Sequence, residues 1–306
     1  MNRGIKIGTR ESQLAVWQAN QVKSLLEKQG HEVELVYIKS EGDANLKTPL
    51  YEIGVQGIFT KALDIALLNN EIDIAVHSLK DVPTQMASDV MQAAVLPRAS
   101  YKDILVPKND TSFLESMEGN AVIATSSNRR RAQWLNRYPN HTVENLRGNV
   151  NTRLQKVKDN AWHGAIFAAA GLERIGLRPQ NAVELDWMLP APAQGAIVIV
   201  CKEDDSYMYD ACQSFHDKIT ALCTAIERDF LRTLLGGCST PISALAKLEN
   251  GQLHFEGSIL STDGKQKKEI TKSVTISETY NLGQIAAHEL LQNGGQQLLD
   301  VIRNEK

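Results

Sequence analysis

The stretch from Asn70 to Thr84, NEIDIAVHSLKDVPT, decides how the fold is interpreted. It opens with closely spaced apolar residues between Ile72 and Val76, a pattern typical of a buried strand. Polar side chains follow at once, and Pro83 closes the segment. These polar residues are His77, Ser78, Lys80 and Asp81. Open α/β sheets carry their chemistry at the carboxyl ends of strands, so the segment predicts a functional loop. A solvated loop with a surface ion pair fits the same pattern.

The composition is that of an ordinary globular protein with room for two or three domains. The chain has 306 residues, 42% of them hydrophobic and 23% charged, with a formal net charge of -3. A negative net charge argues against general attraction to nucleic acid or membrane surfaces. No apolar run approaches the ~18 residues of a membrane span, and the first residues lack the apolar core of a secretory signal.

The cysteines favour a reduced, cytoplasmic protein without a metal. They are Cys201, Cys212, Cys223 and Cys238. None forms a C-x-x-C pair, so a zinc site is not expected. Reduced thiols are typical of the cytoplasm.

The first residues predict a strand, a polar loop and a helix. Residues 5–7 form the strand, GTRES follows at 8–12, and an apolar face marks a helix over 13–29. Ser12 is a candidate N-cap. Free backbone N–H groups, Ser12 and Arg10 would then gather at one place and make an anion site. The alternative is that Arg10 is a surface arginine beside a capped helix.

A second part of the chain repeats this design. Residues 121–124 predict a strand, TSS follows at 125–127, and a helix carries Arg129 to Arg131. Residues 164–168 predict a further buried strand, as residues 72–76 do in the first part. We therefore expect two similar α/β lobes that face each other across a cleft.

The charge pattern of the second lobe predicts a ligand with many negative groups. Residues 125–178 contain eight arginines and two lysines against three acidic residues. Arginine suits carboxylates and phosphates because its planar fork donates two parallel hydrogen bonds. A solvated helix face accounts for some of them, such as Arg137 and Arg178. Nucleic acid is disfavoured because stacking aromatics are nearly absent there and no recognition-helix signature occurs.

The remaining residues predict a return to the first lobe and then a small α+β domain. Residues 189–200, LPAPAQGAIVIV, start as a proline-marked crossover, and residues 196–200 form a buried strand that we place in the first lobe's sheet. A helix follows over 218–235, with Ile219 and Cys223 on its apolar face. Turn signals at 250–251 and 263–264 separate three strands, and a last helix is expected over 282–303.

Cys238 lies in the loop GGCSTP, where glycines leave room around the sulfur. An accessible thiol in such a loop is suited to covalent chemistry, although a structural cysteine is the alternative. The whole pattern divides the chain into lobe 1 over 1–98 and 195–216, lobe 2 over 99–194, and a third domain over 217–306.

Several motifs together resemble one family, porphobilinogen deaminase, also called hydroxymethylbilane synthase. They run nearly the whole length of the chain and in the family's order. The motifs are RESQLA at 10–15, IDIAVHSLKDVPT at 72–84, ATSSNRRRAQ at 124–133, LRGNVNTRL at 146–154, AAAGLERIGL at 168–177, PAPAQGA at 190–196 and LLGGCSTPI at 234–242.

The resemblance implies a fold and an activity. The fold is α/β, with two lobes like those of periplasmic binding proteins and a small α+β C-terminal domain with a three-stranded antiparallel sheet. A dipyrromethane cofactor would be attached to Cys238 through a thioether. Four porphobilinogen molecules would be joined head to tail with loss of ammonia, and hydrolysis would release hydroxymethylbilane for haem biosynthesis.

The resemblance also implies roles for individual residues. Asp81 would be catalytic, because a fixed carboxylate stabilises the cationic azafulvene and the protonated pyrrole and can move the proton. The arginines would bind the acetate and propionate groups of the pyrroles. The implied cofactor-binding residues are Ser78, Lys80, Asp81, Thr125, Ser127, Arg129, Arg130 and Arg153. The implied substrate-binding residues are Arg10, Ser12, Ser126, Arg147, Arg153, Arg174 and Gln194.

The chain departs from the family's pattern at several positions, none of which is Cys238, Asp81 or a matched arginine. Gln56 and Glu52 replace lysines, and residues 99–101 replace Glu-Asp-Pro. The other departures are Gly164 for aspartate, Ala193 for glycine and Ser243 for glycine.

Two other functions are compatible with parts of the pattern. A non-catalytic two-lobed anion-binding protein would have no use for Cys238. A nucleic-acid-binding or regulatory module would use the arginine cluster but lacks a helix-turn-helix segment. We expect the enzyme, with porphobilinogen as its small-molecule partner, no nucleic acid, no membrane, and a monomeric state.

Overall fold

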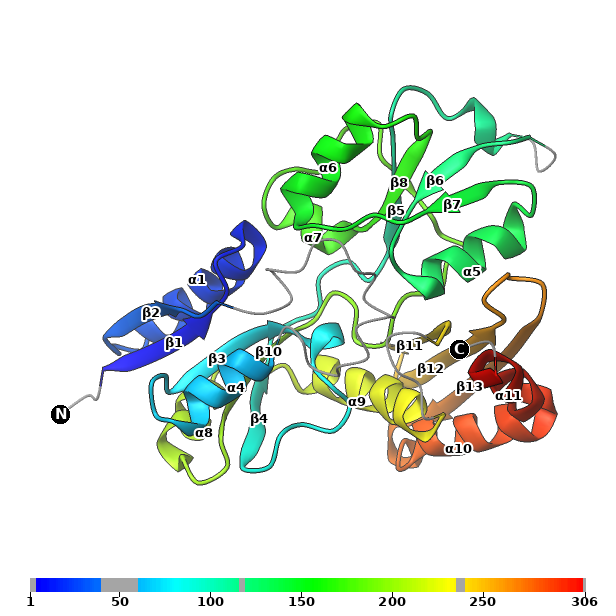
Figure 1. Ribbon diagram of the computed structural model, residues 1–306. Coiled ribbons are helices and arrows are strands. Elements are labelled where there is room, and N and C mark those ends of the chain that lie inside the picture. Colours follow the sequence, from blue (N-terminus) through cyan, green and yellow to red (C-terminus); the bar gives the residue numbers. More distant parts are fainter. Residues whose placement is uncertain (1–3, 40–59, 116–118, 235–239, 305–306) are drawn as a thin grey trace.

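Three separate β-sheets organise the chain, as Figure 1 shows. The computed structural model describes residues 4–39, 60–115, 119–234 and 240–304. Two of the sheets have five strands and each forms the centre of a lobe, and the third is a three-stranded antiparallel sheet. The predicted fold class, two α/β lobes and a small α+β unit, is confirmed.

The first lobe has the strand order β2-β1-β3-β10-β4. Strands β1, β2 and β3 are parallel, and β10 runs antiparallel to its neighbours β3 and β4. The return of residues 196–200 to this sheet is therefore confirmed. The elements are β1 (Ile5–Thr9), α1 (Gln13–Glu27), β2 (Val33–Tyr37), α4 (Lys61–Leu68), β3 (Ile74–Ser78), β4 (Val90–Val95), β10 (Ile197–Lys202) and α8 (Ser206–Gln213).

Helices cover both faces of this sheet because its strands are apolar on both sides. On one face, Val22 and Leu26 of α1 pack with Ile7 and with Met208 of α8. On the other face, α4 packs against residues such as Val198 of β10. Burial on both faces is typical of parallel strands. Because β1, β2 and β3 are parallel, the loops at their carboxyl ends leave the same edge of the sheet.

The second lobe repeats the topology of the first. Its order is β7-β6-β8-β5-β9, in which β6, β7 and β8 are parallel and β5 is antiparallel to β8 and β9. Each strand of this sheet has a counterpart at the same position and with the same relative direction in the first sheet. The elements are β5 (Asp103–Pro107), β6 (Val122–Ala124), α5 (Asn128–Arg137), β7 (Thr142–Glu144), α6 (Val150–Asp159), β8 (Gly164–Ala168), α7 (Ala169–Glu173) and β9 (Val183–Glu184).

The third unit packs its helices on one three-stranded sheet. Phe230 of α9 lies against Phe255 of β12, with ring centroids 5.2 Å apart. The turn at Asn250–Gly251 has φ of 51° and 78°, as its hairpin signal predicts. The elements are α9 (Lys218–Thr233), β11 (Ile242–Glu249), β12 (Gln252–Leu260), β13 (Lys267–Thr275), α10 (Leu282–Leu290) and α11 (Gln296–Asn304).

Two expectations for this unit are wrong. Ile219 is 53% exposed, so the apolar face of α9 begins later than predicted, although Cys223 is buried in the core as expected. The last helix is two helices, because Gly294 has a φ of +94° and ends the regular helical backbone there.

One buried carboxylate joins the third unit to both segments that connect the lobes. These connecting segments are residues 96–102 and residues 189–196. Glu227 of α9 is fully buried and accepts two hydrogen bonds from Arg98, at 2.6 and 3.1 Å. It also accepts the backbone N–H groups of Ala193 at 2.6 Å and Ala246 at 2.7 Å. Ala193 has a φ of +62°, which a glycine adopts without strain.

The described cysteines are buried, and within the described part of the chain no helix is long and apolar enough to cross a membrane. Cys201, Cys212 and Cys223 are free thiols. Burial raises their pKa values to about 11, 12 and 11, respectively. They are therefore poor nucleophiles at neutral pH.

Candidate active site

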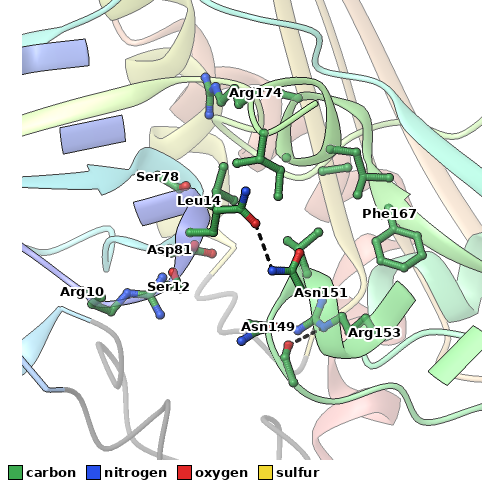
Figure 2. A pocket seen from close by; sticks show the side chains of 18 of the residues that line it. Arg10, Ser12, Leu14, Ser78, Asp81, Asn149, Asn151, Arg153, Phe167 and Arg174 are labelled. Atoms are coloured by element: carbon green, nitrogen blue, oxygen red, sulfur yellow. Dashed lines mark hydrogen bonds between the residues drawn. The ribbon is translucent and has the colours of Figure 1, made fainter. Parts of the chain in front are cut away.

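A cavity of about 630 Å³ lies between the two lobes and is lined by residues of both. The segments that follow β1, β2 and β3 form the wall from the first lobe. Arg130 of α5 and the segments that follow β7 and β8 form the wall from the second lobe. These are the carboxyl ends of the parallel strands, where the sequence predicted the functional loops. Figure 2 shows the labelled side chains of the two walls facing one another.

The cavity is strongly cationic although the chain has a net negative charge. Seven cationic side chains line it, against two carboxylates. The cations are Arg10, Lys39, Lys80, Arg130, Arg147, Arg153 and Arg174, and the carboxylates are Glu11 and Asp81. Charge of one sign in a concave, low-dielectric site attracts ligands of the opposite sign, here a ligand with several negative groups.

The first-lobe wall carries Asp81 and two hydroxyl groups. Asp81 belongs to the short 3₁₀ turn Leu79–Asp81 after β3, and its side chain lines the cavity. Ser12 caps α1 by accepting the N–H of Ala15 at 3.4 Å. The hydroxyl of Ser78 accepts a hydrogen bond from Gln18 at 2.8 Å, which leaves its own proton available to an oxygen in the cavity.

Lys80, on the same wall, has an unusually acidic ammonium group. Burial lowers its pKa to about 8, an effect that the nearby Asp81 carboxylate partly opposes. Its Nζ lies 3.4 Å from Oε1 of Gln194. Lys80 is therefore a cation at neutral pH that loses its charge in mildly alkaline solution.

The second-lobe wall presents arginines whose guanidinium groups are anchored by backbone carbonyls. Nε of Arg153 donates to Gly148 O at 2.7 Å, and an Nη of Arg174 donates to Gly195 O at 2.7 Å. The Arg174 guanidinium also lies 5.8 Å from the ring centroid of Trp17 in the first lobe. Burial lowers the pKa of Arg153 and of Arg174 to about 10, so both stay charged at neutral pH.

Arg129 and Arg130 share one buried carboxylate, Asp103 of β5. Arg130 donates to Asp103 Oδ1 at 3.0 and 2.7 Å, and Arg129 lies 2.8 Å from Oδ2. Burial alone would raise the pKa of Asp103, but the two guanidinium groups outweigh it and hold the pKa at about 2. Arg130 lines the cavity, whereas Arg129 does not and donates to Leu189 O at 2.8 Å.

The other predicted site residues that are absent from the cavity lining are Thr125, Ser126, Ser127 and Gln194. Ser127 caps α5, and the Thr125 hydroxyl accepts the N–H of Ser127 at 3.2 Å. Gln194 is 1% exposed and donates to Asp103 and to the carbonyl of Tyr101. Ser127 thus supports the helix that carries Arg129 and Arg130, and Gln194 contacts both Lys80 and Asp103.

Three predicted residues lie outside the described residues. They are Cys238, Gln56 and Glu52.

Sequence reasoning missed two features of this site. Asp103 could have been suspected, because an acidic residue at the head of the apolar strand DILVP needs a cationic partner when buried. The contact between Gln13 and Asn151 had no such signal. Asn151 donates to Gln13 at 2.9 Å, and Figure 2 shows this bond as a dashed line that joins α1 to α6 at the cavity.

The family models and the curated relatives agree on one family. The family model described as "Porphobilinogen deaminase, dipyromethane cofactor binding domain" matches residues 5–210, and "Porphobilinogen deaminase, C-terminal domain" matches residues 221–292. A solved structure, the periplasmic VFT2 domain of BvgS from Bordetella pertussis, aligns with a TM-score of 0.41 and 12% identity over 68% of this chain and 84% of that chain.

Two curated relatives extend the match along the whole chain. The porphobilinogen deaminase of Syntrophomonas wolfei is 39% identical over 97% of this chain and 98% of its own length. A protein of Methanocaldococcus jannaschii, named "Probable porphobilinogen deaminase", is 46% identical over 85% of this chain and 89% of its own length. By motif order, family models and identity to these relatives, the chain belongs to the porphobilinogen deaminase family.

Proposed function

We propose that this chain is a hydroxymethylbilane synthase, a transferase that joins four porphobilinogen molecules head to tail with loss of ammonia and releases hydroxymethylbilane by hydrolysis. The observation that carries the proposal is the cavity between the lobes, which is lined by seven cationic side chains and by the carboxylate of Asp81. Each porphobilinogen brings an acetate and a propionate, so a growing chain is a polycarboxylate. The excess of cations matches that charge.

The residues present fit a dipyrromethane cofactor, the group for which the matching family model is named. Two linked pyrroles carry four carboxylates, and the cavity offers arginines on both walls. Nε of Arg174 is buried and has no hydrogen-bond partner among the described residues, which suits a site built to receive a carboxylate. When bound, the cofactor supplies a pyrrole carbon that accepts the first substrate unit.

We assign Cys238 as the attachment point. The three other cysteines are buried, and burial raises their thiol pKa values to about 11 or 12. Cys238 is the fourth cysteine of the chain, and two glycines precede it. A thioether at that position would begin a few residues after the end of α9.

The residues of the two walls would then bind either the substrate or the cofactor. Arg147, Arg153 and Arg174 would bind substrate carboxylates from the second lobe, and Arg10, Ser12 and Ser126 would complete that set. The residues that would hold the cofactor are Ser78, Lys80, Asp81, Arg130 and Arg153, the last of which also belongs to the substrate-binding set. We also assign Thr125, Ser127 and Arg129 to the cofactor and Gln194 to the substrate. Direct contact from these four residues and from Ser126, all absent from the cavity lining, needs a change from the geometry described above.

Asp81 would hold and move the proton. Loss of ammonia from the substrate's aminomethyl group leaves positive charge on its pyrrole ring. A carboxylate oxygen of Asp81 beside the pyrrole N–H would stabilise that charge more in the transition state than in the ground state. The same oxygen could accept a proton after the new bond forms.

Three further assignments belong to this proposal. The domains would be residues 1–98 with 195–216, residues 99–194, and residues 217–306. Free, buried thiols support a cytoplasmic location. We propose a monomer, because both cavity walls come from one chain, and size-exclusion chromatography with light scattering tests this.

Intact-mass spectrometry and a product assay test the function. The purified chain should carry an adduct the mass of two pyrrole units, react with Ehrlich's reagent, and convert porphobilinogen to hydroxymethylbilane. Cys238→Ser should lose the adduct and the activity. Asp81→Asn should fold and keep the adduct but lose about 100-fold or more of its turnover. A chain that binds porphobilinogen without an adduct or product would instead be an anion-binding protein.

A further inference from the structure

Arg228 of α9 holds the backbone of the turn that carries Lys80 and Asp81. One Nη of its guanidinium donates to Leu79 O at 3.2 Å and to Val82 O at 2.8 Å. The other Nη donates to Pro83 O at 2.6 Å. Each of these hydrogen bonds goes to a carbonyl oxygen that flanks the turn, so the planar fork fixes the path of the chain on both sides of Asp81.

The turn has little other backbone support. Leu79 N donates to Ala196 O at 3.0 Å, and Val82 N donates to Leu79 O at 3.2 Å within the turn. The side chains of Lys80 and Asp81 line the cavity, and Lys80 Nζ donates to Oε1 of Gln194 at 3.4 Å. Arg228 therefore supplies most of the long-range hydrogen bonds that the structure gives to residues 79–83.

The helix that presents Arg228 is itself firmly placed. The neighbouring residue, Glu227, accepts hydrogen bonds from Arg98, Ala193 and Ala246, so α9 is tied to the connecting segments and to β11. Figure 1 shows α9 between the first-lobe sheet and the sheet of the third unit. Burial lowers the pKa of Arg228 to about 10, so its guanidinium stays charged at neutral pH.

We propose that Arg228 is a positioning residue that sets the place of the Asp81 carboxylate in the cavity. This inference rests on the proposed function. It predicts a loss of turnover rather than of substrate binding, because the carboxylate-binding arginines of the second lobe do not depend on this turn.

The test compares Arg228→Met and Arg228→Lys with Arg232→Met in the full, cofactor-loaded chain. Arg232 lies one turn further along α9, where its side chain is 52% exposed and pairs with Asp229, so it is a matched control. The readouts are kcat and KM for porphobilinogen, loading by intact mass, and hydrogen–deuterium exchange at the amides of Leu79 and Val82.

Arg228→Met should lose about 100-fold in kcat, because a catalytic group displaced by about 1 Å costs a factor of this order. Its KM should change by less than about threefold. Amide exchange at Leu79 and Val82 should be faster, Arg228→Lys should be intermediate, and Arg232→Met should match the wild type.

A folded, loaded Arg228→Met with wild-type kcat, a change in KM alone, or unchanged exchange would overturn the proposal. If Arg228→Met does not fold, Arg228→Lys is judged by the same three criteria, since it keeps the charge and the methylene stem. A wild-type chain that makes no product would refute the proposed function, and the exchange measurement would still decide whether Arg228 holds the turn.

Discussion

Two hydrogen bonds, of 2.7 and 3.0 Å, join the guanidinium of Arg130 to one carboxylate oxygen of Asp103. The other oxygen of Asp103 faces Arg129 at 2.8 Å. All three side chains are buried, so one carboxylate balances two guanidinium groups beneath the cavity. Arg130 also lines the cavity, where it is one of seven cationic side chains.

Asp103→Asn should therefore be strongly destabilising. It leaves two buried cations without a counter-ion, a change that costs about 3–5 kcal/mol of unfolding free energy. Urea unfolding at pH 7 measures this cost. Glu184→Gln is the control, because Glu184 pairs with Lys102 at the surface and its loss should cost no more than about 1 kcal/mol. Equal costs for the two variants would mean that Asp103 is not a structural counter-ion.

The sequence was sufficient to predict which loops meet, but not how their side chains pair. The strand-then-polar-loop pattern predicted functional loops at Arg10 and at Asp81, and both residues line one cavity, because parallel strands deliver their carboxyl ends to one edge of a sheet. The expected repeat of the lobes followed from the same pattern. These predictions depend only on local periodicity and on the direction of strands.

Pairing depends on tertiary placement, which local patterns do not encode. Arg129 and Arg130 are adjacent on α5, so they point in directions about 100° apart and only one of them lines the cavity. Asp103 of β5 reaches both arginines because of the strand order. β5 lies beside β8, and β8 lies beside β6, the strand that leads to α5. The contact between Gln13 and Asn151 likewise exists only once two lobes have closed on each other.

That contact should contribute little stability, but it should be measurable. Gln13→Ala and Asn151→Ala form a double-mutant cycle, for which we expect a coupling energy of about 0.5–1 kcal/mol in unfolding free energy, because the bond is neutral and exposed. Asn20→Ala, on the exposed side of the same helix, should show no coupling to Asn151→Ala. Coupling of the same size in both cycles would argue against a direct bond between the lobes.

Gly195 should not tolerate a side chain. Its φ is +89°, and an added Cβ would lie 2.7 Å from the carbonyl oxygens of both Ala99 and Ser100. Gly195→Ala combines backbone strain with a clash between the two connecting segments, and it should cost about 3 kcal/mol or more in unfolding free energy. The variant should also bind substrate less well, because Gly195 O anchors Arg174.

A substitution at Gly176 separates the backbone strain from the steric clash. It has a φ of +67°, but an added Cβ would meet nothing within 4 Å. Gly176→Ala should therefore show the backbone strain alone, about 1 kcal/mol. If chemical denaturation gives the same loss for both alanine variants, the close approach of the two connecting segments contributes nothing.

Lys80 should make cofactor loading sensitive to alkaline pH. Its pKa is lowered from 10.5 to about 8, chiefly by burial, in the protein without bound carboxylates. Above that pH the amine is neutral and attracts the carboxylates of porphobilinogen less. The second-order rate at which the apoprotein acquires its adduct, followed by intact mass, should fall about tenfold between pH 8 and pH 9.5 if charged Lys80 is required. Lys80→Arg keeps its charge and should show a much flatter profile.

Stability should change in the opposite direction over the same range, which distinguishes the effect from unfolding. Between the folded pKa of about 8 and the ordinary value of 10.5, the unfolded chain keeps the proton on Lys80 that the folded chain has released. The unfolded state then binds more protons, so the contribution of Lys80 to the free energy of unfolding rises with pH, by about 1.4 kcal/mol per unit at most. A loading rate that falls in parallel for wild type and Lys80→Arg would assign the pH dependence to the substrate's own amine instead.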